Sequence, residues 1–200
     1  MTSPTARAGA APSNWNLPNA ITVVRILLAP VFFWLLLADG GEDGGVRIAA
    51  ALLFIVAIAT DGIDGHIARS RGLVTDLGKL LDPIADKVLT GAALVGLSIL
   101  AELPWWVTIV ILVREIGITV FRMAVLSDRV IPASRGGKLK TIVQSVAISL
   151  ALLPLWTFLG EWVHWLNGLT MTAAVVLTVA TGIDYLADAA RQSRAARGRR

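Results

Sequence analysis

Apolar residues fall into six long windows along the chain, separated by short stretches rich in glycine, proline and charge. Each window is close to the roughly 20 residues that a helix needs to cross a bilayer. The breaks carry turn chemistry, because Asp39-Gly40-Gly41 follows the first window and Gly136-Gly137 precedes the fifth. The pattern predicts an all-α polytopic membrane protein with six transmembrane helices. The predicted spans are 19–38, 46–67, 80–101, 104–126, 138–159 and 163–186.

The composition agrees with a membrane protein and excludes several kinds of site. Of the 200 residues, 56% are hydrophobic and only 16% are charged, whereas a soluble domain carries about 25% charged residues. The absence of cysteine excludes disulfides, thiolate metal sites and cysteine nucleophiles. The two histidines, His66 and His164, leave little room for a histidine-rich zinc site.

The basic residues gather on one side of the predicted membrane. They lie after the second and fourth spans and at the C-terminus, while the loops on the other side carry more acidic than basic residues. Such a bias in short loops sets topology, so both termini are predicted to be cytoplasmic, in the cell membrane. This orientation explains much of the net charge of +4 without a nucleic-acid partner. The predicted divisions are a disordered cytoplasmic tail at 1–13, a membrane domain at 14–190 and a basic cytoplasmic tail at 191–200.

Aspartates interrupt the apolar sequence around the second and third predicted spans. Asp61 and Asp64 lie three residues apart, and Gly78, Asp82 and Asp86 follow one another at intervals of four. Either spacing puts the residues on one face of a helix. A polar stretch between the two helices can reverse the chain. We therefore expect a hairpin with both acidic faces opposed at its cytoplasmic end.

Converging carboxylates in a membrane need positive charge nearby. A centrally placed Asp costs about 2.5–3.5 kcal/mol on the insertion scale. Acidic oxygens without His or Cys are typical ligands of Mg²⁺ or Mn²⁺, and two such ions would neutralise four aspartates. Two-metal sites serve in-line displacement at phosphorus. The alternative is a solvated cytoplasmic loop with ordinary ion pairs, but the matching spacing on both helices favours a metal site.

Two glycines and an arginine beside the aspartates indicate a bound nucleotide. A glycine inside a helix is less favourable than alanine by about 1 kcal/mol, so such positions often mark a close approach to the backbone. Gly65 directly follows Asp64, and Gly78 lies one turn before Asp82. A nucleotide between the two helices would fit, with Arg69 against its phosphates.

A phosphorylated substrate would need further cations, and the fourth and fifth spans contain them. Arg114 lies inside the fourth span, where an arginine normally faces the bundle interior or a cavity. Lys138 and Lys140 stand at the start of the fifth span. The alternatives are that Arg114 pairs with the adjacent Glu115 as internal structure, and that the two lysines anchor the helix at the interface.

The stretch that begins at Asp61 and ends at Asp86 reads Asp-x2-Asp-Gly-x2-Ala-Arg-x8-Gly-x3-Asp-x3-Asp. It resembles the complete signature of the CDP-alcohol phosphatidyltransferase family. The resemblance covers roughly residues 15–190. Within the family, Arg114-Glu115 and several residues of the first span are similar to the bacterial phosphatidylglycerophosphate synthases. Those residues of the first span are Asn19, Thr22, Arg25 and Pro30.

The resemblance implies a six-helix membrane enzyme, a homodimer, whose active site opens to the cytoplasmic face. Such enzymes transfer the phosphatidyl group from CDP-diacylglycerol to an alcohol and release CMP. For the subgroup the alcohol is sn-glycerol 3-phosphate. The acceptor could instead be inositol phosphate, phosphatidylglycerol or serine. From a different class, a divalent-cation transporter would also explain the carboxylates, although not the two glycines or the arginine.

The motif match also implies a role for each residue. Two divalent cations, Mg²⁺ or Mn²⁺, would be bound by the four aspartates Asp61, Asp64, Asp82 and Asp86. Asp86 would in addition be the catalytic general base. CDP-diacylglycerol would be bound by Gly65, Arg69 and Gly78. The phosphate of the acceptor would be bound by the basic residues Arg114, Lys138 and Lys140.

Overall fold

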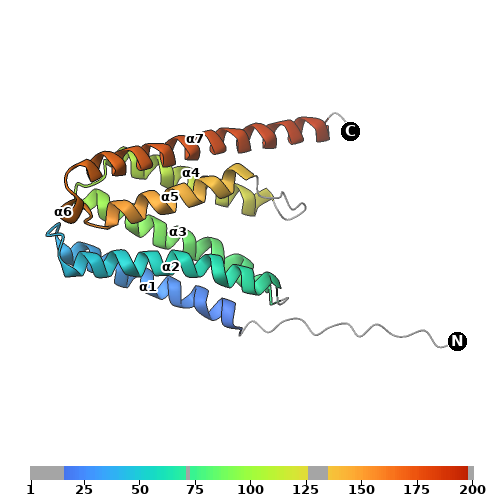
Figure 1. The fold of residues 1–200 in the computed structure, drawn as a ribbon. Helices are drawn as coiled ribbons and strands as arrows, with labels where there is room; N and C mark the ends of the chain where they lie inside the picture. Colours follow the sequence, from blue (N-terminus) through green and yellow to red (C-terminus); the bar gives the residue numbers. More distant parts are fainter. Residues whose placement is uncertain (1–15, 71–72, 126–134, 198–200) are drawn as a thin grey trace.

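The computed structural model describes residues 16–70, 73–125 and 135–197, and these residues form seven helices (Figure 1). The all-α prediction is confirmed. The first three helices are α1 (Leu17–Asp39), α2 (Gly45–Ser70) and α3 (Asp76–Ile99). The others are α4 (Trp105–Val125), α5 (Arg135–Leu152), the four-residue α6 (Trp156–Leu159) and α7 (Trp162–Arg197). The predicted tail at 1–13 lies outside the described residues.

Local sequence signals set the ends of the first three helices. Asn16 caps α1 by accepting a hydrogen bond from the backbone N–H of Asn19, 3.0 Å away. The helix ends at Gly40, whose φ of 62° is in the left-handed region that favours glycine. Asp39 then accepts a backbone hydrogen bond from Arg47 at the start of α2. Thr75 caps α3 by accepting from the backbone N–H of Gly78.

Two of the predicted span boundaries differ from the helix ends by much more than the others. The fifth window was predicted to run through residue 159, but α5 ends at Leu152 because Pro154 cannot continue the helical hydrogen bonds. The chain then forms the separate turn of α6. The last window was predicted to end at residue 186, whereas α7 continues to Arg197. Most of the stretch predicted as a C-terminal tail is therefore helical.

The long helices run side by side with their loops at two opposite ends (Figure 1). α1 packs against α2 and α3, and α5 packs against α7. α4 contacts α3 and α7, while α2 and α3 also contact α5. We call the end that holds α6 the α6 end and the opposite end, with the connection between α2 and α3, the aspartate end. The start of α1 and the last turns of α7 both lie at the aspartate end (Figure 1).

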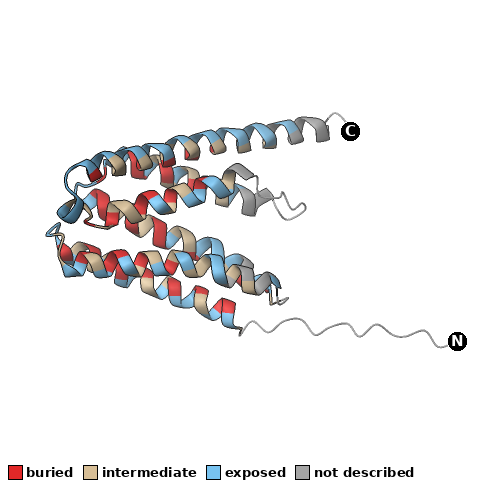
Figure 2. Cartoon of the chain, in the orientation of Figure 1, coloured by how far each residue is buried: buried red, intermediate tan, exposed pale blue. Residues whose placement is uncertain are grey.

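Buried residues line the inner faces of the helices, whereas the outer faces are exposed and largely apolar (Figure 2). Phe32 of α1 and Phe54 of α2 are fully buried, with ring centroids 5.5 Å apart. On the outside, Leu27, Val113 and Leu169 are each more than 60% exposed. An apolar outer surface around an apolar core is expected where lipid rather than water surrounds the helices.

Three helical segments of the described chain are long and apolar enough to cross a membrane. They are Leu17–Asp39, Gly45–Ile63 and Trp162–Ala189. The helices α3, α4 and α5 have 24, 21 and 18 residues, but each carries charged side chains. Those charges include the candidate functional residues Asp82, Asp86, Arg114, Lys138 and Lys140, so residues of the candidate site lower the apolarity of these helices.

Candidate active site

One face of α1 brings together the aspartates of α2 and α3. Thr22 and Arg25 lie one turn apart and are 1% and 2% exposed. The Thr22 hydroxyl donates a hydrogen bond to Oδ1 of Asp82 at 2.8 Å, and the Arg25 guanidinium forms an ion pair with Asp61. Because the two partners share a face of α1, Asp61 and Asp82 converge on the same side of the bundle. The described aspartates of α2 and α3 thus both contact α1, which packs extensively against the two helices, whereas α2 and α3 make few direct contacts with each other. The direct hairpin pairing of their acidic faces stays a prediction.

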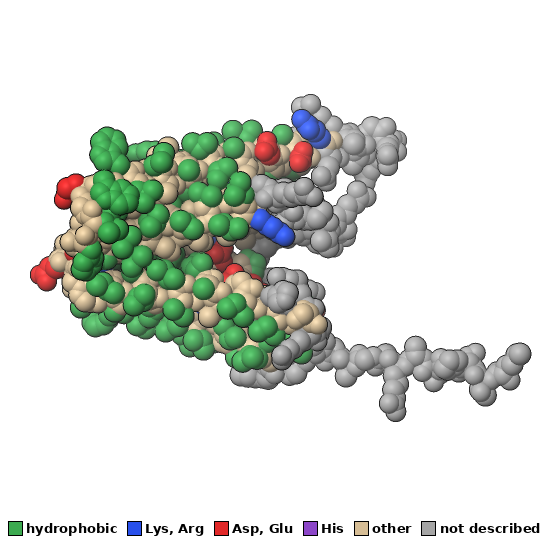
Figure 3. All heavy atoms as spheres, viewed as in Figure 1, with side chains coloured by type: hydrophobic (Ala, Val, Ile, Leu, Met, Phe, Trp, Pro, Cys, Tyr) green, Lys and Arg blue, Asp and Glu red, His purple; other side chains and the backbone are tan. Residues whose placement is uncertain are grey.

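The third described aspartate, Asp86, lies one turn after Asp82 on α3. Its Oδ2 accepts a hydrogen bond from Nζ of Lys87 at 2.8 Å. The side chains of Asp86 and Asp61 are 29% and 43% exposed, so both can be reached from outside the protein. Acidic side chains are visible in the hollow that separates the two halves of the bundle in Figure 3. The hollow is open at the aspartate end.

The remaining predicted residues of the motif are described only in part. Gly65 is half-buried in α2, one turn after Asp61. The side chains of Asp64 and Arg69 lie outside the described residues. Among the side chains that the structure does describe, no three carboxylates or histidines lie close enough together to hold a metal ion. Metal ligation by the four aspartates therefore stays a prediction.

Gly78 lies in the first turn of α3, directly against α1. A Cβ atom at this position would be 2.6 Å from Oδ1 of Asn19 and 3.3 Å from Oγ1 of Thr75. Nδ2 of Asn19 donates to the Thr75 hydroxyl at 2.8 Å, and the same hydroxyl caps the helix through the backbone N–H of Gly78. The close approach that the sequence predicted at Gly78 is thus made by a side chain of α1. Its contact with a nucleotide stays a prediction.

The predicted acceptor residues Arg114 and Lys140 meet at one buried carboxylate. Glu115 is 3% exposed, and its Oε1 accepts from Nη1 of Arg114 at 2.9 Å and forms an ion pair with Lys140. Nζ of Lys87 lies 2.7 Å from its Oε2. The ion pair between Arg114 and Glu115 that the sequence offered as an alternative is present. We call the four residues Lys87, Arg114, Glu115 and Lys140 the Glu115 cluster.

Thr181 contacts the Glu115 cluster, whereas the predicted acceptor residue Lys138 does not. Nη2 of Arg114 donates to the hydroxyl of Thr181 on α7 at 3.0 Å, a contact that no spacing in the sequence indicates. Lys138 is exposed at the start of α5. It lies two residues before Lys140 and so on the opposite side of the helix. The structure therefore brings Arg114 and Lys140 together but leaves Lys138 apart from them. The adjacency of Lys87 to Asp86 was the one sequence signal for its place in the cluster.

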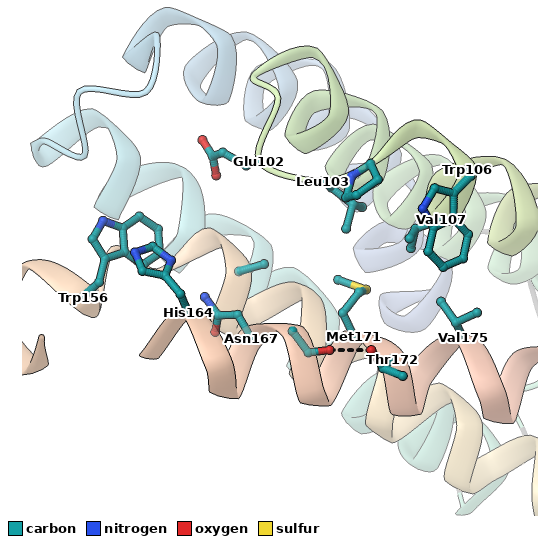
Figure 4. A pocket seen from close by; sticks show the side chains of 13 residues that line it. Glu102, Leu103, Trp106, Val107, Trp156, His164, Asn167, Met171, Thr172 and Val175 are labelled. Carbon is teal, nitrogen blue, oxygen red and sulfur yellow. Dashed lines mark hydrogen bonds between the residues drawn. The ribbon is translucent and has the colours of Figure 1, made fainter. Parts of the chain in front are cut away.

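A separate cavity of about 390 Å³ lies at the α6 end, between α4 and α7 (Figure 4). Its walls include Val107, Met171 and Val175, and the rings of Trp156 and His164 stack beside it with centroids 4.9 Å apart. None of the predicted site residues lines this cavity. The candidate active site is thus the open hollow at the aspartate end.

Comparison with known proteins agrees with the motif. The sequence profile of the CDP-alcohol phosphatidyltransferase family matches residues 15–186. A probable phosphatidylglycerophosphate synthase of Mycobacterium tuberculosis H37Rv is 51% identical over 176 residues, which cover 88% of this chain and 82% of the relative. A CDP-diacylglycerol–glycerol-3-phosphate 3-phosphatidyltransferase of Bacillus subtilis is 41% identical, over 86% of this chain and 93% of the relative. The chain is therefore a multi-pass membrane protein and belongs to the CDP-alcohol phosphatidyltransferase family.

Proposed function

We propose that this phosphatidyltransferase transfers the phosphatidyl group of CDP-diacylglycerol to sn-glycerol 3-phosphate and releases CMP. The names of the relatives support this acceptor, since the Bacillus subtilis protein is named for glycerol 3-phosphate. The observation that carries the proposal is the ion pair of Lys87 with both Asp86 and Glu115. This contact supports the proposal, because Lys87 links the cations of the Glu115 cluster to the carboxylate that is the candidate base.

Two divalent cations, Mg²⁺ or Mn²⁺, would be held by Asp61, Asp64, Asp82 and Asp86. The described residues fit such ions in their chemistry, because their donors are all carboxylate oxygens and include neither His nor Cys. Each described aspartate also has a neighbour that orients it, namely Arg25, Thr22 or Lys87. When bound, two ions stabilise charge on the attacking and leaving oxygens of an in-line displacement.

The side chains of this chain would supply the remaining parts of the reaction. Asp86 accepts the proton of the 1-hydroxyl of glycerol 3-phosphate as the new oxygen–phosphorus bond forms. The bond between the lipid-bearing phosphorus and the oxygen of CMP breaks in the same step, so CMP leaves with its phosphate. Gly65 would leave room for the cytidine diphosphate, and Arg69 would balance its charge. Gly78 would act beside them by letting α3 lie close to α1.

Arg114 and Lys140 would bind the phosphate of the acceptor, and Lys138 would attract it at the surface. Arginine and lysine differ here, because the planar guanidinium can donate two parallel hydrogen bonds to one phosphate while the ammonium acts as a point charge. The side chain of Arg114 is 18% exposed and that of Lys140 is 4% exposed. Arg114 is therefore the member of the pair that an incoming phosphate meets first.

The proposal includes six membrane crossings, made by α1 to α5 and α7, with the site and both termini on the cytoplasmic side. The excess of lysine and arginine near the aspartate end supports this orientation. So do Trp105, Trp106, Trp162 and Trp165 near the α6 end, each at least 50% exposed, as in an aromatic belt at the outer interface. We also propose the homodimer that the family resemblance implies.

The test is an assay of CMP release by the purified protein in lipid nanodiscs that contain CDP-diacylglycerol. Each alcohol is added alone: glycerol 3-phosphate, inositol phosphate, phosphatidylglycerol or serine. We expect release with glycerol 3-phosphate only, dependent on added Mg²⁺ or Mn²⁺. Release with another alcohol and none with glycerol 3-phosphate would reject the proposed acceptor. Multi-angle light scattering of the same sample measures the oligomeric state.

A further inference from the structure

Glu115 takes no part in the proposed chemistry, yet cations from three helices converge on its carboxylate. We infer that Glu115 is a positioning residue that builds the binding site for the phosphate of the acceptor and fixes its place relative to Asp86. This inference rests on the proposed function, because it requires an acceptor that carries a phosphate.

Both oxygens of Glu115 are used. Oε1 holds Arg114 of its own helix α4 and Lys140 of α5. Oε2 holds Lys87 of α3 at 2.7 Å, and Nζ of Lys87 lies 2.8 Å from Oδ2 of Asp86. The two oxygens therefore face different parts of the site. One holds the proposed phosphate-binding cations, and the other is linked through a single ammonium group to the candidate base.

The charged groups around Glu115 carry a net positive charge, which favours the binding of an anion. In the described contacts, three positive groups (Lys87, Arg114 and Lys140) meet two negative ones (Asp86 and Glu115). The side chains of Glu115 and Lys140 are each 4% exposed, so water does little to screen them. A phosphate monoester carries negative charge and several acceptor oxygens, and it can reach the cluster through the partly exposed Arg114 and Lys87.

A positioning role and simple charge neutralisation predict different effects on the two substrates. A carboxylate that only offsets nearby cations would affect stability and both substrates alike. A carboxylate that sets the position of Arg114 and Lys140 affects the acceptor, whose phosphate they bind. It leaves the binding of CDP-diacylglycerol to the aspartate motif of α2 and α3. The KM values of the two substrates should therefore respond differently when Glu115 is changed.

The experiment compares Glu115→Gln and Glu115→Asp with the wild type in nanodiscs. Gln keeps the shape of the side chain but loses its charge, and Asp keeps the charge but withdraws it by one methylene. We expect Glu115→Gln to raise the KM for glycerol 3-phosphate at least tenfold and to leave the KM for CDP-diacylglycerol within twofold. Glu115→Asp should give an intermediate increase in the KM for glycerol 3-phosphate.

The matched control is Glu102→Gln at the α6 end. Glu102 also pairs with a buried cation, because Nη1 of the fully buried Arg47 donates to it at 2.8 Å. This change should lower thermal stability and leave both KM values unchanged. If it raises the KM for glycerol 3-phosphate as much as Glu115→Gln does, the effect is general destabilisation and the inference is wrong.

The remaining outcomes are also decisive. A folded Glu115→Gln protein with the wild-type KM for glycerol 3-phosphate, or with equal increases for both substrates, overturns the inference. If Glu115→Gln does not fold, Glu115→Asp decides, and a wild-type KM in that variant overturns it. Failure of the proposed function is seen separately, because the wild type itself would then release no CMP with glycerol 3-phosphate. CMP release with an acceptor that carries no phosphate, and none with glycerol 3-phosphate, would overturn both the proposed function and the inference about Glu115.

Discussion

The contact between Gly78 and α1 leads to a prediction about a single methyl group. Gly78→Ala places a Cβ 2.6 Å from Oδ1 of Asn19 and 3.3 Å from Oγ1 of Thr75. Asn19 is 6% exposed and is tied to Thr75 by a hydrogen bond of 2.8 Å, so its amide cannot simply turn away. The added methyl group must either push α1 away from α3 or break that hydrogen bond.

The expected change in the free energy of unfolding combines two destabilising effects and one stabilising effect. Overpacking a well-packed contact costs about 1–3 kcal/mol. Loss of the hydrogen bond between Asn19 and Thr75 adds about 1 kcal/mol. Alanine is favoured over glycine in a helix by at most about 1 kcal/mol, and less in the first turn where Gly78 lies. We therefore expect Gly78→Ala to destabilise the protein by about 2 kcal/mol, or about 4–8 °C in Tm for a chain of this size.

The assay is thermal unfolding of the purified variants in one detergent, followed by CMP release in nanodiscs. Gly117→Ala is the control, because a Cβ on that glycine meets nothing within 4 Å. The reasoning also predicts coupling: Asn19→Ala removes the clash, so the double variant should lose at least 1 kcal/mol less than the two single variants together. An unchanged Tm in Gly78→Ala, or strictly additive effects with Asn19→Ala, would refute the packing role. An increased KM for CDP-diacylglycerol at unchanged Tm would instead support nucleotide contact alone.

Three further predictions concern the metal site and the far end of the bundle. Asp82→Asn and Asp86→Asn should each reduce CMP release at least about 100-fold without lowering Tm, because each removes a charge proposed to hold metal and Asp86 is also the candidate base. Activity near wild type in either variant contradicts that role. Thr22→Val, which removes the hydroxyl that orients Asp82, should raise the Mg²⁺ concentration needed for half-maximal activity about tenfold, and an unchanged requirement would count against it. Glu102→Gln should lower the free energy of unfolding by about 1–3 kcal/mol, because it leaves the buried Arg47 without its charged partner. Chemical unfolding measures this change, and a variant curve that coincides with that of the wild type would contradict the prediction.

Apolar windows predicted the long helices well, since a run of about 20 apolar residues has few other stable forms in a membrane. The windows gave the wrong helix end in two places: where a proline interrupts an apolar stretch, and where a helix continues into charged sequence. Pro154 ends α5 although the sequence around it remains apolar, and α7 continues through charged residues beyond the window. The number of membrane crossings depends on whether α3, α4 and α5 cross. These helices carry charged residues, so a criterion based on apolarity alone does not select them.

The candidate site was predicted only as far as helical spacing reaches. Spacing relates residues on one helix, and it placed Asp82 and Asp86 on one face of α3. It contains no information on which side chains of other helices meet them. The Glu115 cluster joins residues up to 53 positions apart, from Lys87 to Lys140. Such contacts follow from the packing of α3 against α4 and α5, which depends on the shapes of all three helices.

The first helix shows what a pattern of polar residues in a membrane span can mean. Asn19, Thr22 and Arg25 recur every three residues on one face of α1, in a segment that is otherwise apolar. Each contacts the region of the motif: Asn19 lies against Gly78, Thr22 bonds to Asp82 and Arg25 pairs with Asp61. A helix that served only as an anchor would gain nothing from burying three polar side chains, since each must be satisfied inside the protein. The polar face of α1 is therefore part of the candidate active site, although every named residue of the aspartate motif lies on α2 or α3.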